Sequence, residues 1–177
     1  MCNNSCIEFG KRQLRKKQVK GLRVLEVGAL DVNGSLREYV ESLKPVSYIG
    51  IDLVSGKGVD FVCPAENIIF GFGKESFDLV ICTEMLEHVK LWALVINNLK
   101  LVCKIGGIIL LTTRSKGFPK HDFPNDYWRF EIEDMKHIFS DCEDVIVERD
   151  PEMPGVFVRA IRTEILLDLK DYEVQPY

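Results

Sequence analysis

Two residues in the first third of the chain have the types and the spacing that suit the binding of a nucleoside. Gly28 follows the apolar run RVLEV, and a glycine there lets the chain turn sharply and lets a ligand approach the backbone. Asp52 comes 24 residues later, after SYIGI, where a carboxylate can accept hydrogen bonds from both hydroxyls of a ribose. Taken singly, each has an ordinary alternative as a turn glycine or a strand-end acid.

Two further polar segments follow apolar runs in the same way. CPAEN, residues 63–67, comes after VDFV, and its Ala65 and Glu66 could contact an adenine ring. TEMLEHV, residues 83–89, comes after FDLVIC. Ligands of open α/β sheets bind beyond the carboxyl ends of the strands. Four such turns in chain order therefore favour one nucleoside site.

Two histidines are candidates for a catalytic base. His88 lies in LEHV, and its alternative role is a structural hydrogen bond at the start of a helix. His121 lies in a polar loop with Asp122 and Asp126 nearby, and such a loop would cover the site. We therefore expect His121, and then His88, to be the groups that move a proton if the reaction needs one.

The densest cluster of chemically useful side chains is DYWRF, residues 126–130. In one interpretation Tyr127 and Arg129 face the pocket, and with Asp126 they join the catalytic candidates. In the other, Trp128 and Phe130 anchor the loop while Asp126 and Arg129 pair with each other. The residue types alone leave both interpretations open.

No metal site is expected. His137 lies in the helical pattern IEDMKHIF as a surface residue, and the three histidines share no metal-ligand spacing. Cys2 and Cys6 are four apart, but no nearby histidine or third cysteine completes a site with them. The six cysteines are scattered along the chain, which is typical of reduced thiols in a cytoplasmic protein.

From Leu22 onward, apolar runs alternate with amphipathic segments. The expected strands are LRVLEVG, SYIGID, a short VDFVC, FDLVIC and GIILLTT, and then EDVIVE and GVFVRAIR as an antiparallel pair around RDPEMPG. FDLVIC and GIILLTT are apolar almost throughout, as expected of parallel strands covered on both faces. Only six residues, LVSGKG, separate Asp52 from Val59. Either the usual crossover helix is reduced to a loop, or VDFVC is barely a strand.

Three segments show the spacing of amphipathic helices. Their apolar stripes are Leu36, Tyr39, Val40 and Leu43, with Asn33 or Ser35 as N-cap; Leu91, Leu94, Val95, Leu99 and Val102, ending before Gly106 and Gly107; and Ile132, Met135, Ile138 and Phe139. Free N–H groups at the start of the first helix would favour a carboxylate or phosphate. The alternation predicts a three-layer α/β domain with a mostly parallel sheet.

The 177 residues suit a single domain flanked by two segments of their own character. Residues 1–21 form a basic arm, either a solvated helix face or a weak contact for nucleic acid or an anionic substrate; its cations are Lys11, Arg12, Arg15, Lys16, Lys17 and Lys20. The net charge of −4 argues against nucleic-acid binding by the whole surface. In the tail, residues 164–177, the apolar Ile165, Leu166, Leu167 and Leu169 suggest a closing helix or strand extension. No apolar run is long enough to span a membrane, and no signal peptide opens the chain.

The ordered set of segments resembles a known family. E-x-G at 26–28, G-x-D at 50–52, A-E at 65–66, FDLVxxxExLEH at 77–88 and GG-xxxxT at 106–112 look like class I S-adenosylmethionine-dependent methyltransferases. Among these, the chain resembles the small methyltransferase type-11-like domains, with EVGALDVNGSLR as a variant first motif. HDFPNDYWRF is similar to an H-x-x-P-x-D-Y-W-R-F segment that some members carry after strand five. The resemblance covers about Val24 to Val158.

This resemblance implies S-adenosylmethionine as cofactor and a three-layer Rossmann-like methyltransferase fold. The implied sheet has seven strands, mostly parallel, with an antiparallel last strand. The implied cofactor-binding residues are Glu26, Gly28 and Ala29 at the methionine end, Asp52 and Leu53 at the ribose, Ala65 and Glu66 near the adenine, and Thr83 and Glu84 at the end of strand four. Leu30 replaces the second glycine of the common first motif, and Pro64 replaces an acid near the adenine. Because proline has no N–H, adenine recognition must depend on its neighbours.

Other functions remain open at this stage. A dinucleotide needs a pyrophosphate cradle, and GALDVNG does not supply G-x-G-x-x-G, so the sulfonium cofactor is favoured. A noncatalytic module that binds S-adenosylmethionine or a nucleotide is a second alternative. The methyl acceptor is a small molecule or a modified macromolecule, and oxygen, nitrogen and carbon acceptors are all compatible. The chain is expected to be a monomer or a homodimer.

Overall fold

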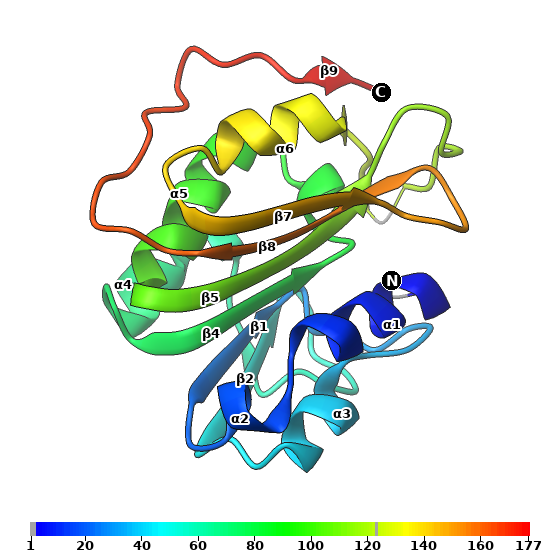
Figure 1. Ribbon diagram of the computed structural model, residues 1–177. Helices are drawn as coiled ribbons and strands as arrows, with labels where there is room; N and C mark the ends of the chain where they lie inside the picture. Colours follow the sequence, from blue (N-terminus) through cyan, green and yellow to red (C-terminus); the bar gives the residue numbers. More distant parts are fainter. Residues whose placement is uncertain (1–2, 123) are drawn as a thin grey trace.

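The computed structural model describes residues 3–122 and 124–177, and its centre is a seven-stranded sheet (Figure 1). The strands lie in the order β3-β2-β1-β4-β5-β8-β7. Five are mutually parallel: β1 (Arg23–Val27), β2 (Ser47–Asp52), β3 (Phe61–Val62), β4 (Phe77–Thr83) and β5 (Cys103–Arg114). β8 (Gly155–Ile161) is antiparallel to both β5 and β7 (Glu143–Arg149). The predicted antiparallel last strand is thereby confirmed.

Central strands β4 and β5 are buried on both faces, as their apolar sequences predict. Leu79, Val80, Ile81 and Cys82 of β4 have no exposed surface. Strands covered on both sides lose the alternation of apolar and polar residues. The run FDLVIC is therefore a reliable signal of the middle of a parallel sheet.

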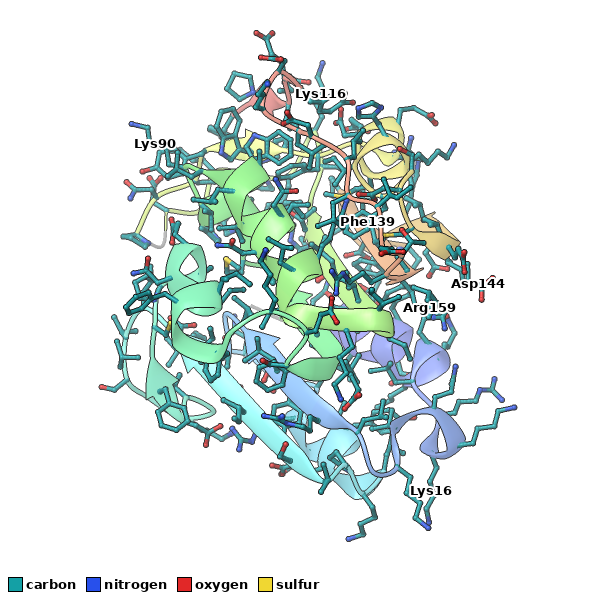
Figure 2. All side chains as sticks on the ribbon, turned by 90° about the vertical axis from the view of Figure 1, so that its left-hand side faces the viewer. Lys16, Lys90, Lys116, Phe139, Asp144 and Arg159 are labelled. Carbon is teal, nitrogen blue, oxygen red and sulfur yellow. The ribbon has the colours of Figure 1, made fainter. Side chains whose placement is uncertain are left out.

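Helices cover both faces of the sheet and complete the three expected layers (Figures 1 and 2). One face carries α4 (Ile68–Phe72), α5 (Trp92–Val102) and α6 (Ile132–Ile138), and the other carries α1 (Asn4–Gln13), α2 (Lys16–Val19) and α3 (Arg37–Ser42). Two short 3-10 helices, η1 (Ala65–Asn67) and η2 (Leu86–His88), lie at strand ends. Within residues 3–122 and 124–177, no helix has the length and apolarity that crossing a bilayer requires.

The expected basic arm is part of the folded layer. Phe9, Leu14 and Val19 are fully buried, and they pack with residues of β1, β4 and β8. The six lysines and arginines all point outward and are exposed, as expected of a solvated helix face; Figure 2 shows Lys16 extending away from the fold. Cys2 lies outside the described residues.

The helix after β1 begins later than its apolar stripe indicates. α3 starts at Arg37, its N-cap is Leu36, and no side chain caps it. The predicted caps are wrong: Ser35 Oγ instead accepts from the N–H of Arg37 at 3.0 Å, in the turn before the helix. The eight residues between Gly28 and α3, 29–36, form a loop, and no residue of α3 lines the cavity at the carboxyl ends of the strands.

Three further expectations need correction or refinement. The connection between β2 and β3 contains no helix and β3 has two residues, so both readings of the short LVSGKG connection hold. In α5, Leu91 and Leu94 are 55% and 43% exposed, and Trp92 and Ile96 take their places in the core. β5 begins at Cys103, before the two glycines.

The tail forms neither a closing helix nor an extension of the main sheet. Its only regular element within the described residues is β9 (Gln175–Pro176), which pairs antiparallel with β6 (Trp128–Arg129). Leu169 is buried, whereas Ile165 is 80% exposed. The apolar run was too irregular to show which residue would anchor the segment.

Candidate functional site

The turn after β1 needs a glycine for two independent reasons. Gly28 has φ +81°, a conformation that side chains rarely adopt. A Cβ added there would lie 2.7 Å from the Cβ of Met85. The N–H groups of Gly28 and Ala29 both donate to the carbonyl oxygen of Ile51, at 2.9 Å each, and so tie the turn to β2. The positive φ and the nearby Met85 are therefore the two reasons why position 28 requires a glycine.

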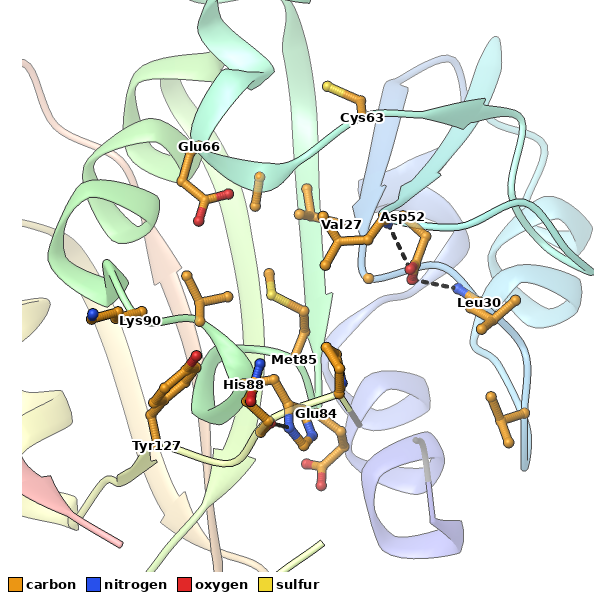
Figure 3. Close-up of a pocket in the computed structure, with 17 residues that line it drawn as sticks. Val27, Leu30, Asp52, Cys63, Glu66, Glu84, Met85, His88, Lys90 and Tyr127 are labelled. Carbon is orange, nitrogen blue, oxygen red and sulfur yellow. Dashed lines mark hydrogen bonds between the residues drawn. The ribbon is translucent and has the colours of Figure 1, made fainter. Parts of the chain in front are cut away.

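Asp52 at the end of β2 is held by backbone donors from two loops. Its Oδ2 accepts from the N–H of Leu30 at 3.1 Å, and its Oδ1 accepts from the N–H of Leu53 at 2.7 Å (Figure 3). Oδ1 also accepts from the N–H of Val54 at 3.5 Å, whereas Oδ2 has a second lone pair with which it can accept a hydroxyl hydrogen. The carboxylate is thereby oriented at the edge of a cavity.

That cavity has a volume of about 250 Å³ and lies over the carboxyl ends of β1, β2 and β4. Its walls are mostly apolar and carry a few polar groups, as is typical of a ligand pocket (Figure 3). The lining residues are Val27, Gly28, Leu30, Val32, Asp52, Leu53, Cys63, Ala65, Glu66, Glu84, Met85, His88, Val89, Lys90, Pro124, Asn125 and Tyr127.

Glu84, at the end of β4, combines backbone strain with burial. Its φ is +53°, and its carboxylate pairs with the guanidinium of Arg114, which also contacts Asp150 at 3.2 Å. Burial and the nearby carboxylate of Glu87 raise the pKa of Glu84 to about 8, against the opposing effect of Arg114. Conformations of this kind cost about 1–3 kcal/mol and cluster at functional sites.

The loop after β5 brings His121 to the side of His88. The two rings meet edge to face with centroids 4.7 Å apart. Oε1 of the fully buried Glu87 lies 3.8 Å from Nε2 of His88 and 3.7 Å from Nε2 of His121. Burial opposes the ionisation of Glu87, but His121 and His88 outweigh it and lower the pKa of that carboxyl.

This arrangement overturns the reason for expecting no metal site. The histidines are far apart in sequence, yet the fold places one ligand atom each from Glu87, His88 and His121 within 4.8 Å of one another. The short-range spacing that signals a metal site cannot report ligands that come from separate loops. The third histidine, His137, stacks on Tyr172 instead.

The sequence matches one family model, described as a methyltransferase domain, over residues 4–143. The match covers most of the chain. The chain belongs to the methyltransferase-domain family. A search of curated proteins found no match.

Solved methyltransferases share the fold at low sequence identity. The 1,6-didemethyltoxoflavin-N1-methyltransferase from Burkholderia thailandensis is 16% identical, with a TM-score of 0.69, over 92% of this chain and 80% of that one. Phosphoethanolamine N-methyltransferase 2 from Haemonchus contortus is 16% identical with a TM-score of 0.68, over 92% of this chain. The CurJ carbon methyltransferase is 16% identical with a TM-score of 0.63, over 89% of this chain. The chain spans only 53% and 52% of the last two.

The methyltransferase cavity contains most but not all of the predicted cofactor residues. Gly28, Asp52, Leu53, Ala65, Glu66 and Glu84 line it. Glu26, Ala29 and Thr83 do not: all three are buried beneath it. Glu26 accepts a hydrogen bond from the hydroxyl of Tyr48 at 2.9 Å, and Ala29 packs towards Gly50.

The predicted catalytic residues divide between the cavity wall and its support. His88 and Tyr127 line the cavity. Asp126 and Arg129 pair with each other through two contacts of 2.5 and 2.7 Å, so Arg129 does not face the cavity. His121 lies behind His88, and its backbone N–H donates to Asp126 at 3.0 Å. The structure has the pairing of Asp126 with Arg129 that the anchoring interpretation predicts, and of the other interpretation only the position of Tyr127 agrees with it.

The anchoring half of that motif is also present. Trp128 Nε1 donates to the carbonyl of Val89 at 2.9 Å, and Phe130 is fully buried. Burial opposes the ionisation of Asp126, but the guanidinium of Arg129 outweighs it and lowers the pKa of that carboxyl. The loop is therefore fixed at both ends of the segment that carries Tyr127.

Several site residues were missed in the sequence. Met85 and Val89 line the cavity but are apolar residues inside a motif chosen for its polar ones. Asn98 of α5 donates to the carbonyls of Ala65 and Glu66, at 3.3 and 2.8 Å, and so fixes η1. A buried amide within an apolar helix was the signal that could have identified it.

Proposed function

We propose that this chain transfers a methyl group from S-adenosylmethionine to an acceptor bound between the cofactor and the loop after β5. The observation that carries the proposal is the cavity over β1, β2 and β4, which Gly28 and Asp52 both line. Membership of the methyltransferase family and the shared fold support the choice of cofactor. Structures of two neighbours contain S-adenosylhomocysteine, the product of that cofactor.

The chemistry of the walls supports this cofactor over a dinucleotide. Side chains of Leu30 and Val32 line the cavity in the loop after β1, where a pyrophosphate would need close backbone approach. The first N–H groups of that loop are also occupied, by Ile51 and Asp52. S-adenosylmethionine carries no phosphate, so it needs no such cradle.

Each end of the cofactor has suitable partners. We assign the ribose hydroxyls to Asp52, whose Oδ2 retains a free lone pair. Ala65 and Glu66, held by Asn98, lie where the adenine would bind. The methionine end approaches the backbone at Gly28. Three buried residues would shape the turn after β1 and the end of β4 without lining the cavity: Glu26, Ala29 and Thr83.

Methyl transfer from a sulfonium is an in-line displacement, so the enzyme mainly aligns the acceptor and excludes water. His88 and Tyr127 lie on the loop side of the cavity, where an acceptor would sit. Asp126, Arg129 and His121 position these two residues. The acceptor is a small molecule or a protruding group of a macromolecule, and Pro124 and Asn125 of the same loop also line the cavity.

Calorimetric titration of the purified chain tests the cofactor. We expect S-adenosylhomocysteine to bind with a stoichiometry of one and NAD to show no binding at the same concentrations. Binding of NAD without S-adenosylhomocysteine would refute the proposal. Incubation with tritiated S-adenosylmethionine and separate pools of metabolites and RNA then identifies the acceptor class. If RNA is labelled, and if its labelling falls as the salt concentration rises, we infer that the exposed cations of residues 11–20 contact the RNA.

A further inference from the structure

Three potential metal ligands converge beside the cofactor cavity. Glu87, His88 and His121 each offer one ligand atom, and these atoms lie within 4.8 Å of one another. Oε1 of Glu87 is 3.8 Å from Nε2 of His88 and 3.7 Å from Nε2 of His121. Glu87 and His88 come from η2, and His121 comes from the loop after β5. Two histidines and one carboxylate form a common donor set for divalent transition metals.

The remaining atoms of these side chains are already held by other groups. Nδ1 of His88 donates to the carbonyl of Asn125 at 2.5 Å, and Nδ1 of His121 lies 3.1 Å from Oδ2 of Asp126. Each ring is therefore oriented through its Nδ1, with Nε2 turned towards the other ligands, where it can bind an ion once it has lost its proton. Carboxylates and carbonyls in these positions are the usual outer partners of metal-bound histidines.

The two carboxylate oxygens of Glu87 likewise have different surroundings. Its Oε2 accepts a hydrogen bond from the hydroxyl of Thr113 at 2.8 Å, whereas its buried Oε1 has no hydrogen-bond partner among the described residues. The side chain has no exposed surface. A buried carboxylate oxygen without a partner is costly, and here it points towards two imidazole nitrogens that are too distant for ordinary hydrogen bonds.

We propose that Glu87, His88 and His121 bind one divalent transition-metal ion of the zinc type. Bonds of about 2.0–2.1 Å to a tetrahedral ion place ligand atoms about 3.3 Å apart. The two separations from Glu87, 3.7 and 3.8 Å, therefore need to contract by only a few tenths of an ångström. The two histidine ligand atoms lie within 4.8 Å of each other, so the rings must also move closer together to share an ion. Mg²⁺ and Ca²⁺ prefer all-oxygen ligands and fit this set poorly.

The position of the ion beside the cavity indicates how it would act on the acceptor, and this step rests on the proposed methyl transfer. Because His88 lines the cavity, we place the acceptor at the fourth position of the ion. A hydroxyl bound there would release its proton to water more readily. The acceptor oxygen would then form the new O–C bond as the C–S bond of the sulfonium breaks. The sulfur keeps that electron pair and leaves as a neutral thioether. The site thus favours an oxygen acceptor.

Binding of Co²⁺, a visible probe for zinc sites, tests the proposal without any acceptor. After treatment with a chelator, we expect the wild-type chain to bind one Co²⁺ per molecule and to release it when Zn²⁺ is added. His121→Ala should weaken Co²⁺ binding at least tenfold. His137→Ala is the matched control and should bind as the wild type does, because this histidine lies outside the cluster. Cys63→Ser should also bind normally, which excludes the thiol in the cavity wall.

The outcomes separate the metal site from the proposed function. Absence of stoichiometric Co²⁺ binding by the wild type, or normal binding by His121→Ala, would overturn the metal site. Glu87→Gln tests the carboxylate, and His121→Ala keeps the test valid if that buried substitution prevents folding. Titration with S-adenosylhomocysteine is run on the same samples. If the samples bind Co²⁺ but not S-adenosylhomocysteine, the cofactor assignment is refuted and the metal site is not.

Discussion

The carboxylate of Asp52 accepts a hydrogen bond from the backbone N–H of Leu30, so the acid at the end of β2 fixes the loop that follows β1. The same carboxylate is the proposed partner of the ribose hydroxyls. One side chain therefore shapes the cavity and supplies its main polar contact. This dual role explains how a first motif without its usual second glycine can still present a regular binding surface.

Asp52→Ala should weaken the binding of S-adenosylhomocysteine by more than tenfold. The substitution removes the ribose acceptor and releases the N–H groups of Leu30 and Leu53, and charge-assisted hydrogen bonds contribute about 1.5–3 kcal/mol. Titration calorimetry measures the dissociation constant. Asp171→Ala, at an exposed position of the tail, is the matched control. An unchanged constant in Asp52→Ala would refute the assigned role.

Gly28→Ala should both destabilise the fold and impair cofactor binding. Gly28 and Gly21 share φ +81°, but an added Cβ would collide with Met85 at position 28 and meet nothing within 4 Å at position 21. Gly21→Ala therefore reports the backbone strain alone, about 1 kcal/mol. Urea unfolding should show a larger loss for Gly28→Ala. Equal losses in the two variants would show that the contact with Met85 does not matter.

Much of the sheet was predictable because its signals are local. FDLVIC and GIILLTT are apolar without alternation, and this pattern requires cover on both faces. Gly28 and Asp52 could be placed at one edge because parallel strands end on the same side. Their neighbours in the cavity, such as Met85, needed coordinates, since apolar side chains at strand ends are indistinguishable from core residues in a sequence.

Features that depend on contacts between distant segments could not be predicted. His88 and His121 are 33 residues apart, and only the path of the loop after β5 brings their rings together. The start of α3 was misplaced because good capping residues precede it, while the loop needs those residues for its own hydrogen bonds. The tail was misread because its pairing partner, β6, has only two residues.

Asp150 should make stability depend on pH in the acid range. Burial opposes its ionisation, but hydrogen bonds from Ser5, at 2.6 Å, and from other donors outweigh this and lower its pKa. A lowered folded-state pKa means that the stabilisation is present above the unfolded value of about 3.9 and is lost as the pH falls through the folded value. Asp150→Asn should therefore cost about 2 kcal/mol near pH 7, and much less below pH 3.

Urea unfolding of the wild type and Asp150→Asn between pH 7 and pH 3 measures that difference. Asp150 also receives hydrogen bonds from Asn3 and Arg114, so it links the start of α1 to β5. Asp171→Asn, at an exposed position, should leave the curve unchanged. A gap between wild type and Asp150→Asn that stays constant with pH would contradict the ionic origin of the effect.

Arg129→Lys should loosen the loop that carries Tyr127 while leaving the rest of the fold intact. The guanidinium of Arg129 contacts both oxygens of Asp126 and lies over the ring of Tyr177, with 4.3 Å to its centroid. An ammonium group cannot make the paired contacts, so we expect a loss of about 1–3 kcal/mol at this buried pair. Hydrogen exchange should accelerate in residues 115–127 and stay slow in β4 and β5.

The exposed Arg149 provides a matched control, because its nearest acidic partner, Glu131, is 3.7 Å away. Arg149→Lys should leave exchange in the loop unchanged, since exposed pairs contribute little. Arg129→Lys should also bind S-adenosylhomocysteine within about twofold of the wild type, because Asp52 lies on the opposite side of the cavity from Tyr127. Slow exchange in the loop of Arg129→Lys would show that Trp128 and Phe130 alone position Tyr127, and that the ion pair serves another purpose.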